Sequence, residues 1–277
     1  MKVLVCTNGK RHVEGAITFS VDLLKRSRPT VTLLYVQSEG EAEEAGKTAL
    51  ETGRQSIRVF HPELEVLVKT RRGRVAQEIL METRQGSHDL LVMGSKGRSE
   101  TIVGVSEFVI SEVVDDVIRA CPISAFVIKE PQPLSRVLLC TDGSTPAERA
   151  VTWWGQLKKT QEPRVTVLHV VPEIHARFRD FLSPTSARQL ELLQGLPTEP
   201  ARCLSQAKRI LACFGIDAGM SLREGHAAEE ILRESERGYD LIVMGFRGLK
   251  EATRPTLGSQ TIKVMQHSTI PVVAWKG

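Results

Sequence analysis

The chain has 277 residues, and because globular domains average about 150 residues, this length favours two hydrophobic cores. Hydrophobic residues make up 41% of the sequence and charged residues 25%, a composition that excludes a disordered chain and a membrane protein. The 37 basic and 33 acidic side chains leave a net charge of +4, too small to indicate a nucleic-acid-binding protein without a concentrated basic patch. We therefore expect a soluble globular protein with neither nucleic-acid nor membrane partners.

The amino-terminal residues MKVLVCTNGK contain too short an apolar stretch for a secretory signal, and no run approaches the ~18 apolar residues of a membrane span. We therefore expect a cytoplasmic protein. The cysteines are odd in number and form no CxxC pair, so they fit neither a disulfide framework nor a zinc site. We interpret them as small buried hydrophobic side chains in a reducing compartment: Cys6, Cys121, Cys140, Cys203 and Cys213.

The chain contains an internal repeat. The segment VLVCTNG at 3–9 recurs 134 residues later as VLLCTDG, and DLLVMG at 89–94 recurs 151 residues later as DLIVMG. Gly73 has its counterpart 152 residues later at Gly225, so about 18 extra residues must lie in the second copy between Val170 and Gly225. We interpret this insertion either as an excursion over the rim of a sheet or as a lid that senses bound ligand.

A proline-rich segment, Glu130-Pro131-Gln132-Pro133, separates the two copies and interrupts both helix and strand. We predict two domains, residues 1–130 and residues 134–277.

Each copy alternates short β-branched runs with segments of helical length. The strands predicted in the second copy are Val137–Cys140, Val165–Val170, about Asp217–Arg223, Leu241–Met244 and Ile270–Trp275. Strands that are apolar throughout and joined by helical crossovers predict a parallel sheet covered on both faces. The fold class is therefore α/β, with two tandem, doubly wound, five-stranded parallel-sheet domains.

An open parallel sheet binds ligands at the carboxyl ends of its strands, where the winding reverses. In the second copy, the first strand leads into Asp142 and the fourth into Gly245. Nine residues separate Gly248 from the pair Gly258 and Ser259, which opens the last helical segment. Glycine permits close backbone approach, serine offers a hydroxyl, and a helix N-terminus presents N–H groups with partial positive charge. Together these features suit a phosphate group.

This G-x-x-G-x9-G-S pattern, with an acidic residue at the tip of the first strand, resembles the nucleotide-binding motif of the universal stress protein family. The resemblance covers nearly the whole chain as two tandem domains, and it implies a Rossmann-like fold of the adenine nucleotide alpha hydrolase type. It also implies an adenine nucleotide ligand, ATP or else ADP or AMP, with or without Mg²⁺. The residues it places near the base and ribose are Thr141, Asp142, Val170, Met244 and Gly245. Those it places at the phosphates are Gly248, Gly258, Ser259 and Thr261.

Two features of this motif leave alternatives open. Gln260 stands where the family more often has a small apolar residue. The glycines could be ordinary turn residues, and Asp142 could serve only to start the following helix.

The first copy departs from the pattern. Asn8 replaces the acidic residue, Lys10 replaces the serine that follows the next glycine, and Glu107-Phe108 stand where the second copy has the Gly-Ser pair. Thirteen residues before the proline of the last strand, the second copy has Gly258 and the first has Val109. Because a carboxylate repels phosphate and a β-branched residue lacks the freedom of glycine, we predict one competent and one degenerate site.

The fifth strands, Ile123–Ile128 and Ile270–Trp275, would form apolar sheet edges that need covering. The family resemblance implies dimerisation through this strand, so we expect the two copies to pair with each other as an internal pseudo-dimer. A homodimer of the whole chain stays open.

The sequence contains no GxxxxGK[ST], GxSxG or HExxH motif, and we assign no catalytic or metal-binding residue. We therefore expect a binding protein with at most slow ATP hydrolysis. The resemblance implies a stress-response or signalling role through nucleotide-dependent conformation or partner binding. Two alternatives are a nucleotidyl-transfer or ATP-cleaving enzyme and a dimerisation scaffold that binds no nucleotide.

Overall fold

The structure is a computed structural model that describes residues 1–95, 110–157, 162–172, 199–246 and 257–277. Its strands are β1 (Lys2–Cys6), β2 (Thr30–Gln37), β3 (Val66–Arg72), β4 (Leu90–Gly94), β5 (Ser124–Ile128), β6 (Arg136–Cys140), β7 (Arg164–Val171), β8 (Ala218–Glu224), β9 (Leu241–Gly245) and β10 (Val272–Trp275). Its α-helices are α1 (Arg11–Leu24), α2 (Glu43–Phe60), α3 (Val75–Gln85), α4 (Glu112–Ala120), α5 (Thr145–Gln156), α7 (Glu199–Ala212), α8 (Ala227–Ser235) and α9 (Ser259–His267).

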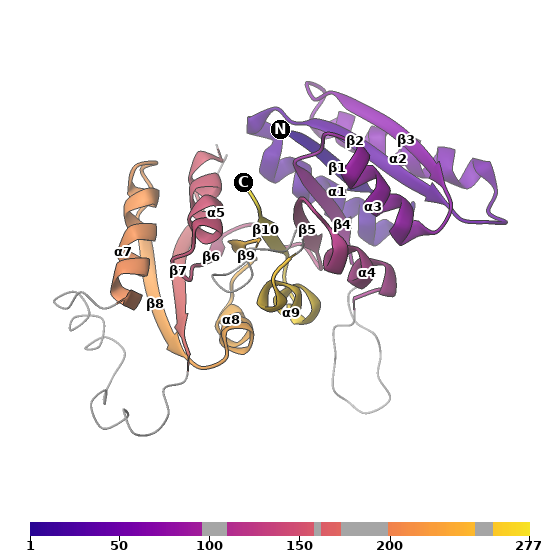
Figure 1. Ribbon diagram of the computed structural model, residues 1–277. Helices are drawn as coiled ribbons and strands as arrows, with labels where there is room; N and C mark the ends of the chain where they lie inside the picture. Colours follow the sequence, from indigo (N-terminus) through magenta and orange to yellow (C-terminus); the bar gives the residue numbers. More distant parts are fainter. Residues whose placement is uncertain (96–109, 158–161, 173–198, 247–256) are drawn as a thin grey trace.

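The strands form one continuous sheet in the order β3-β2-β1-β4-β5-β10-β9-β6-β7-β8. Within each copy all pairings are parallel, and the first strand lies beside the fourth, as β1 beside β4 and β6 beside β9. The winding therefore reverses between these strands, at the place where the sequence predicts a ligand. The expected class of two tandem, doubly wound α/β units is confirmed, and Figure 1 shows them side by side along the sheet.

The two copies meet through their fifth strands. β5 and β10 pair antiparallel, with Val127 opposite Val272, Phe126 opposite Val273 and Ala125 opposite Ala274. The predicted pairing of the fifth strands is thus present, and each strand covers the edge of the other copy's sheet.

The sheet register defines which residues of the last strands are equivalent. Leu91 of β4 pairs with Ala125, whereas Ile242, the repeat counterpart of Leu91, pairs with Val272. Ala125 and Val272 are therefore equivalent, 147 residues apart.

Helices α4 and α9 are related by the same offset of 147 residues. Their buried faces are Val114, Val117 and Ile118 in α4, and Thr261, Val264 and Met265 in α9. Phe126 and Val273 are also 147 residues apart, and they pair with each other. The pseudo-twofold axis therefore passes through this pair, which is fully buried.

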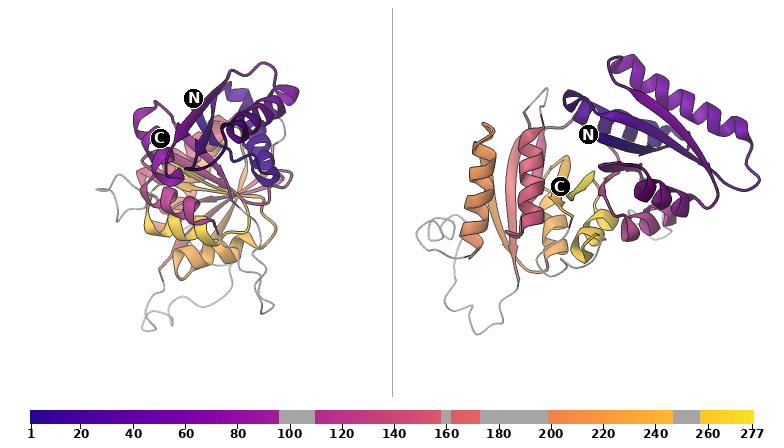
Figure 2. Two further views of the ribbon diagram at one scale, coloured as in Figure 1. Left: turned by 90° about the vertical axis from the view of Figure 1, so that its right-hand side faces the viewer. Right: turned by 45° about the horizontal axis from the view of Figure 1, so that its top comes forward.

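The helices cover both faces of the sheet, as the two views of Figure 2 show. One buried apolar cluster joins α1, α2, α5 and α7 to the sheet, with Ile17 and Trp154 among its members. The other joins α3, α4, α8 and α9 to the opposite face, with Ile118 and Val264 among its members. Both clusters contain residues of both copies, so each core continues across the β5–β10 junction.

The interpretation of the five cysteines as buried side chains is confirmed only in part. Cys121 and Cys140 are buried; burial raises the pKa of Cys121 to about 11 and raises that of Cys140 well above its ordinary value. Cys6 and Cys203 are half-buried, and Cys213 is exposed near the end of the α7 segment, so the interpretation is wrong for Cys213. In the described ranges, no helix is both long and apolar enough to cross a membrane.

A buried ion-pair cluster joins β3 to α3. Arg71 donates from Nε to Glu78 at 2.7 Å and from Nη1 to Glu82 at 2.6 Å, while Lys69 Nζ lies 2.7 Å from Glu82. Burial opposes ionisation of Glu82, but the bonds from Lys69, Arg71 and His88 prevail and lower its pKa to about 2. In the second copy, Arg223 makes the equivalent contacts with Glu230 and Glu234 and joins β8 to α8.

We expect this cluster to make stability fall in acid. Because the pKa of Glu82 is lowered from 4.5 to about 2 on folding, its contribution is present above pH 4.5 and disappears as the pH falls towards 2. Denaturant unfolding of the wild type and of Glu82→Gln at pH 7, 4 and 2.5 should show a difference of about 3 kcal/mol that shrinks across this window. The control is Glu44→Gln, because the Glu44 side chain is 80% exposed. Equal losses for wild type and Glu82→Gln between pH 4.5 and 2 would contradict the assignment.

Candidate functional site

A hydrogen-bonded turn fixes the tip of the first strand of the second copy. Thr141 Oγ1 accepts a bond from Gly143 N at 3.1 Å, and Asp142 Oδ1 accepts bonds from the backbone N, at 3.0 Å, and the hydroxyl of Ser144. Ser144 is the N-cap of α5, and its Oγ accepts from Ala147 N at 3.4 Å. Gly143 has φ +75°, a backbone conformation that favours glycine. The strand tip is therefore tied directly to the start of α5.

The first copy makes the same turn without an acidic residue. Thr7 Oγ1 accepts from Gly9 N at 3.2 Å, and Asn8 Oδ1 accepts from Lys10 N at 3.1 Å. An amide oxygen thus supports this turn as a carboxylate does. Ser144, and not Asp142, caps α5, but Asp142 holds this N-cap residue through two bonds and so contributes to the start of the helix. The turn does not require the negative charge of Asp142, because Asn8 supports the same turn in the first copy.

Gly245 brings two helix N-termini together at the tip of β9. A Cβ atom on Gly245 would lie 2.7 Å from Ala147 N and 2.8 Å from Pro146 C, so α5 begins directly against this glycine. The Gly245 carbonyl accepts a bond from Thr261 Oγ1 in the first turn of α9, at 3.2 Å. Gly94 packs against α1 in the same way in the first copy. Close helix packing therefore explains this glycine in both copies.

The N-cap residue of helix α9 has no side chain. Its N-cap is Gly258, whose backbone N donates to Phe246 O at 3.0 Å, and its first turn contains no acidic residue. Gln260 Oε1 accepts from Ala228 N at 3.2 Å, so this departure from the family pattern joins the start of α9 to the start of α8. Gly258 has φ −67° and ψ 152°, which other residues adopt freely, so the argument from the backbone freedom of glycine is wrong here.

The equivalent helix of the first copy begins differently. The N-cap of α4 is Ser111, whose Oγ accepts from Val114 N at 3.3 Å, and Glu112 and Asp115 lie in its first turn. Ser111 and Gly258 are 147 residues apart, the offset that relates the two helices. Matching Gly258 with Val109 was therefore wrong by two residues. Glu112, not Glu107, is the acidic residue at the start of the first copy's last helix.

The other predicted site residues have mixed outcomes. Val170 is half-buried in β7, where it pairs with Arg223 of β8, and Met244 is buried in β9 opposite Ala274. Gly248 lies outside the described residues, in 247–256, as do most of the insertion, at 173–198, and Glu107-Phe108 and Val109 of the first copy. His169 was not among the predicted site residues. It is buried, and its Nδ1 atom lies 2.8 Å from the Thr141 carbonyl oxygen, so it supports the strand tip.

The electrostatic character of this region comes from helix ends. The N-termini of α5 and α9 meet at Gly245, and Gln260 adds the N-terminus of α8. Each N-terminus carries about half a positive charge, so three of them favour an anion between them. In the part of the chain described, no three His, Cys, Asp or Glu side chains form a group that could hold a metal ion.

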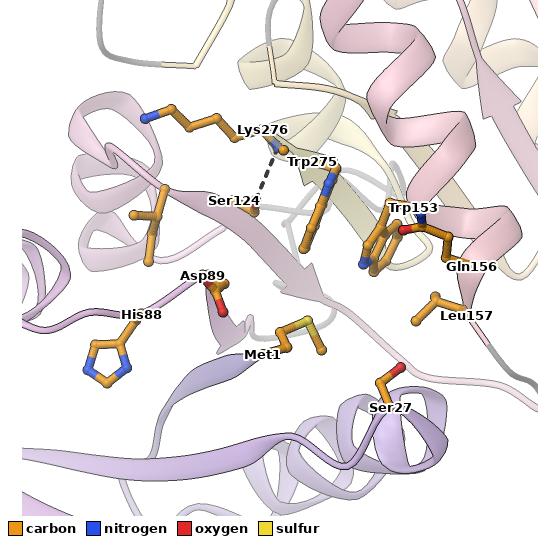
Figure 3. A pocket seen from close by; sticks show the side chains of 12 residues that line it. Met1, Ser27, His88, Asp89, Ser124, Trp153, Gln156, Leu157, Trp275 and Lys276 are labelled. Atoms are coloured by element: carbon orange, nitrogen blue, oxygen red, sulfur yellow. Dashed lines mark hydrogen bonds between the residues drawn. The ribbon is translucent and has the colours of Figure 1, made fainter.

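A cavity of about 440 Å³ lies elsewhere, between the two copies (Figure 3). The Trp153 and Trp275 rings stack along one wall with their centroids 4.6 Å apart, and Met1 and Ser27 of the first copy contribute to the opposite side. None of the predicted site residues lines this cavity. Trp154 is fully buried in the core, while Trp153 covers a surface between the copies, as the adjacent positions of the two side chains in one helix suggest.

Comparisons with known proteins agree with one another. The Universal stress protein family matches residues 1–129 and 133–276. Universal stress protein YxiE of Bacillus subtilis is 30% identical over 143 residues, which cover 50% of this chain and 97% of the relative. Universal stress protein Slr1230 of Synechocystis is 20% identical over a 309-residue alignment that covers 99% of both chains. A solved universal stress protein from Archaeoglobus fulgidus, 17% identical with TM-score 0.62, covers 99% of this chain and 98% of its own and has the same fold.

The contact between Gly245 and α5 predicts that this position tolerates no side chain. We expect Gly245→Ala to lower the free energy of unfolding by about 1–3 kcal/mol, because the new Cβ would force α5 away from β9. The control is Gly219→Ala in β8, where the nearest atom to the new Cβ is 3.7 Å away and the change should stay within about 0.5 kcal/mol. Denaturant unfolding measures both, and equal stability of the two variants would refute this packing argument.

Proposed function

Because the chain belongs to the universal stress protein family as a tandem two-domain member, which implies a stress-response role, we propose that its second copy binds an adenine nucleotide. The ligand is ATP, ADP or AMP, and it lies at the carboxyl edge of β6 and β9. The first copy binds none. Nucleotide binding acts through a change in conformation or in affinity for a partner, and not through rapid catalysis.

The difference between α9 and α4 carries this proposal. α9 begins with a glycine that offers no side-chain cap and has no acid in its first turn, whereas α4 begins with a capping serine followed by Glu112. The first N–H groups of a helix need partners, and a phosphate can supply them where the N-cap side chain does not. At the start of α4 the serine hydroxyl already takes this place, and the Glu112 carboxylate would repel a phosphate.

The remaining residues divide between the two ends of the nucleotide. We assign Asp142 to the ribose hydroxyls, a role that uses the charge this turn does not need, with Thr141, Val170, Met244 and Gly245 beside the base and ribose. Gly258, Ser259 and Thr261, with Gly248, receive the phosphates. The Thr261 hydroxyl already donates to Gly245 O, so we assign its backbone N–H to the ligand.

In this proposal Mg²⁺ binds to the phosphate oxygens of ATP and neutralises part of their charge. One universal stress protein has been solved in complex with cAMP, so this nucleotide belongs among the ligands to be tested. A site for adenine nucleotides also requires a compartment that supplies them, and the proposal places the chain in the cytoplasm.

Isothermal titration of the whole chain with ATP should give one site per chain. Two equivalent sites would contradict the assignment of the first copy as degenerate. A thermal-shift panel of ATP, ADP, AMP and cAMP, with and without Mg²⁺, then identifies the ligand, because a ligand that binds only the folded state raises its stability. No shift with any of them would favour the scaffold alternative, and multiple turnovers of ATP with Mg²⁺ would favour the enzyme.

Two substitutions test the residues. Asp142→Asn reproduces the turn of the first copy, so we expect an unchanged thermal midpoint without ligand and an affinity for ATP reduced about tenfold or more, equivalent to about 1.4 kcal/mol. Ser259→Glu places a carboxylate where the first copy has Glu112 and should weaken ATP binding more strongly than adenosine binding. The matched control is Glu112→Ser, which should leave the stoichiometry and affinity unchanged. Wild-type affinity in both Asp142→Asn and Ser259→Glu would refute the assigned site.

A further inference from the structure

Helix α9 of the second copy is held at its C-terminal end by the first copy. Lys129, directly after β5, donates from Nζ to the carbonyl oxygens of Gln266, at 2.8 Å, and of Ser268, at 2.7 Å. Gln266 also donates from Nε2 to Asp115 Oδ1 of α4, at 2.5 Å. Both contacts cross from one copy to the other and reach the helix whose opposite end is assigned to the phosphates.

The burial of Lys129 is unusual for its type. The residue is only 1% exposed, and burial lowers the pKa of its ammonium group to about 8. Placing a charged group inside a protein costs free energy that an apolar side chain of similar size avoids. A contact that served only to join the two copies would not need this charge.

The pseudo-twofold axis supplies a counterpart for comparison. Lys276 lies 147 residues after Lys129, directly after β10, and its Nζ donates to Pro122 O beyond the end of α4, at 2.6 Å. Lys276 is exposed, whereas Lys129 is buried. The more enclosed of the two lysines is therefore the one at the end of α9.

We propose that Lys129 is a positioning residue for the nucleotide site: the first copy uses it to hold α9, and to balance the charge at its C-terminal end, so that the opposite end binds phosphate. This inference rests on the proposed function. It gives the degenerate copy a role in binding at the site of the other.

The physical reason lies in the helix dipole. The carbonyl end of α9 carries about half a negative charge, which the ammonium group compensates, so the positive potential at the N–H end attracts an anion with less opposition. The nine residues of α9 span about 14 Å, a distance at which a unit charge in a medium of effective dielectric ~20 changes the affinity for an oppositely charged group by about fivefold or more. The adenosine part of the ligand is assigned to the carboxyl ends of β6, β7 and β9, away from the C-terminal end of α9.

The experiment measures ATP and adenosine affinities by isothermal titration of the full chain. We expect Lys129→Met to weaken ATP binding about fivefold and to leave adenosine binding within about twofold, and Lys129→Arg to restore most of the ATP affinity. The matched control is Lys47→Met, which removes a lysine of the first copy whose side chain is 69% exposed, and which should leave both affinities unchanged. General loosening of the structure would weaken both ligands alike, so the difference between ATP and adenosine identifies the effect of α9.

The outcomes separate this inference from the proposed function. If the wild type binds no adenine nucleotide, the proposed function fails. If the wild type binds ATP but Lys129→Met binds it equally well, or loses ATP and adenosine equally, only the role of Lys129 is overturned. If Lys129→Met does not fold, Lys129→Gln decides, because it removes the charge and keeps an N–H donor at this position; unchanged ATP affinity in that variant overturns the inference.

Discussion

The antiparallel pairing of β5 with β10 is the contact on which the rest of the structure depends. Each strand closes the edge of the other copy's sheet, and the pair at the pseudo-twofold axis, Phe126 and Val273, is fully buried. Because the pairing turns two five-stranded sheets into one, both apolar clusters run through the junction and neither copy has a separate core. The same pairing places α4 beside α9 and Lys129 against the end of α9. Without it, the second copy would lack the contacts from Lys129 and Asp115 that hold the C-terminal end of α9.

The two copies share a framework and differ in the chemistry at its ends. The turn at the first strand tip, the glycine at the fourth and the buried arginine–glutamate cluster occur in both. These shared features are explained by folding alone, so they carry no argument for a ligand. What is specific to the second copy is a carboxylate in place of Asn8, and a last helix that begins with Gly258 and Ser259 in place of one that begins with Ser111 and Glu112. The proposal of a single nucleotide site rests on these differences.

The repeat makes the fold class predictable from the sequence, because motifs that recur in the same order imply the same succession of strands and helices in each copy. The alignment of α4 with α9 was not predictable from the prolines that precede the last strands. Two residues separate Ser268, the C-cap of α9, from Pro271, whereas Cys121, the C-cap of α4, directly precedes Pro122. The burial of Lys129 was not predictable either: a lysine after an apolar strand is typical of a surface, and its partners lie 137 and 139 residues away in the chain. The hydrophobic periodicity of a segment indicates which face of a helix or strand is apolar. It does not indicate which residues of the other copy pack against the end of a strand.

The antiparallel junction also determines what a partner protein would encounter. Parallel sheets joined in this way point their carboxyl edges in opposite directions, so the end of β10 lies beside the beginning of β5, where Lys276 N bonds to Ser124 Oγ. A protein that docked over the ligand edge of the second copy would therefore meet the amino ends of the first copy's strands on the same surface. Substitutions there could change which partner is recognised without touching the nucleotide. If the proposed function holds, the copy without a nucleotide would be the one in which substitutions can change partner specificity.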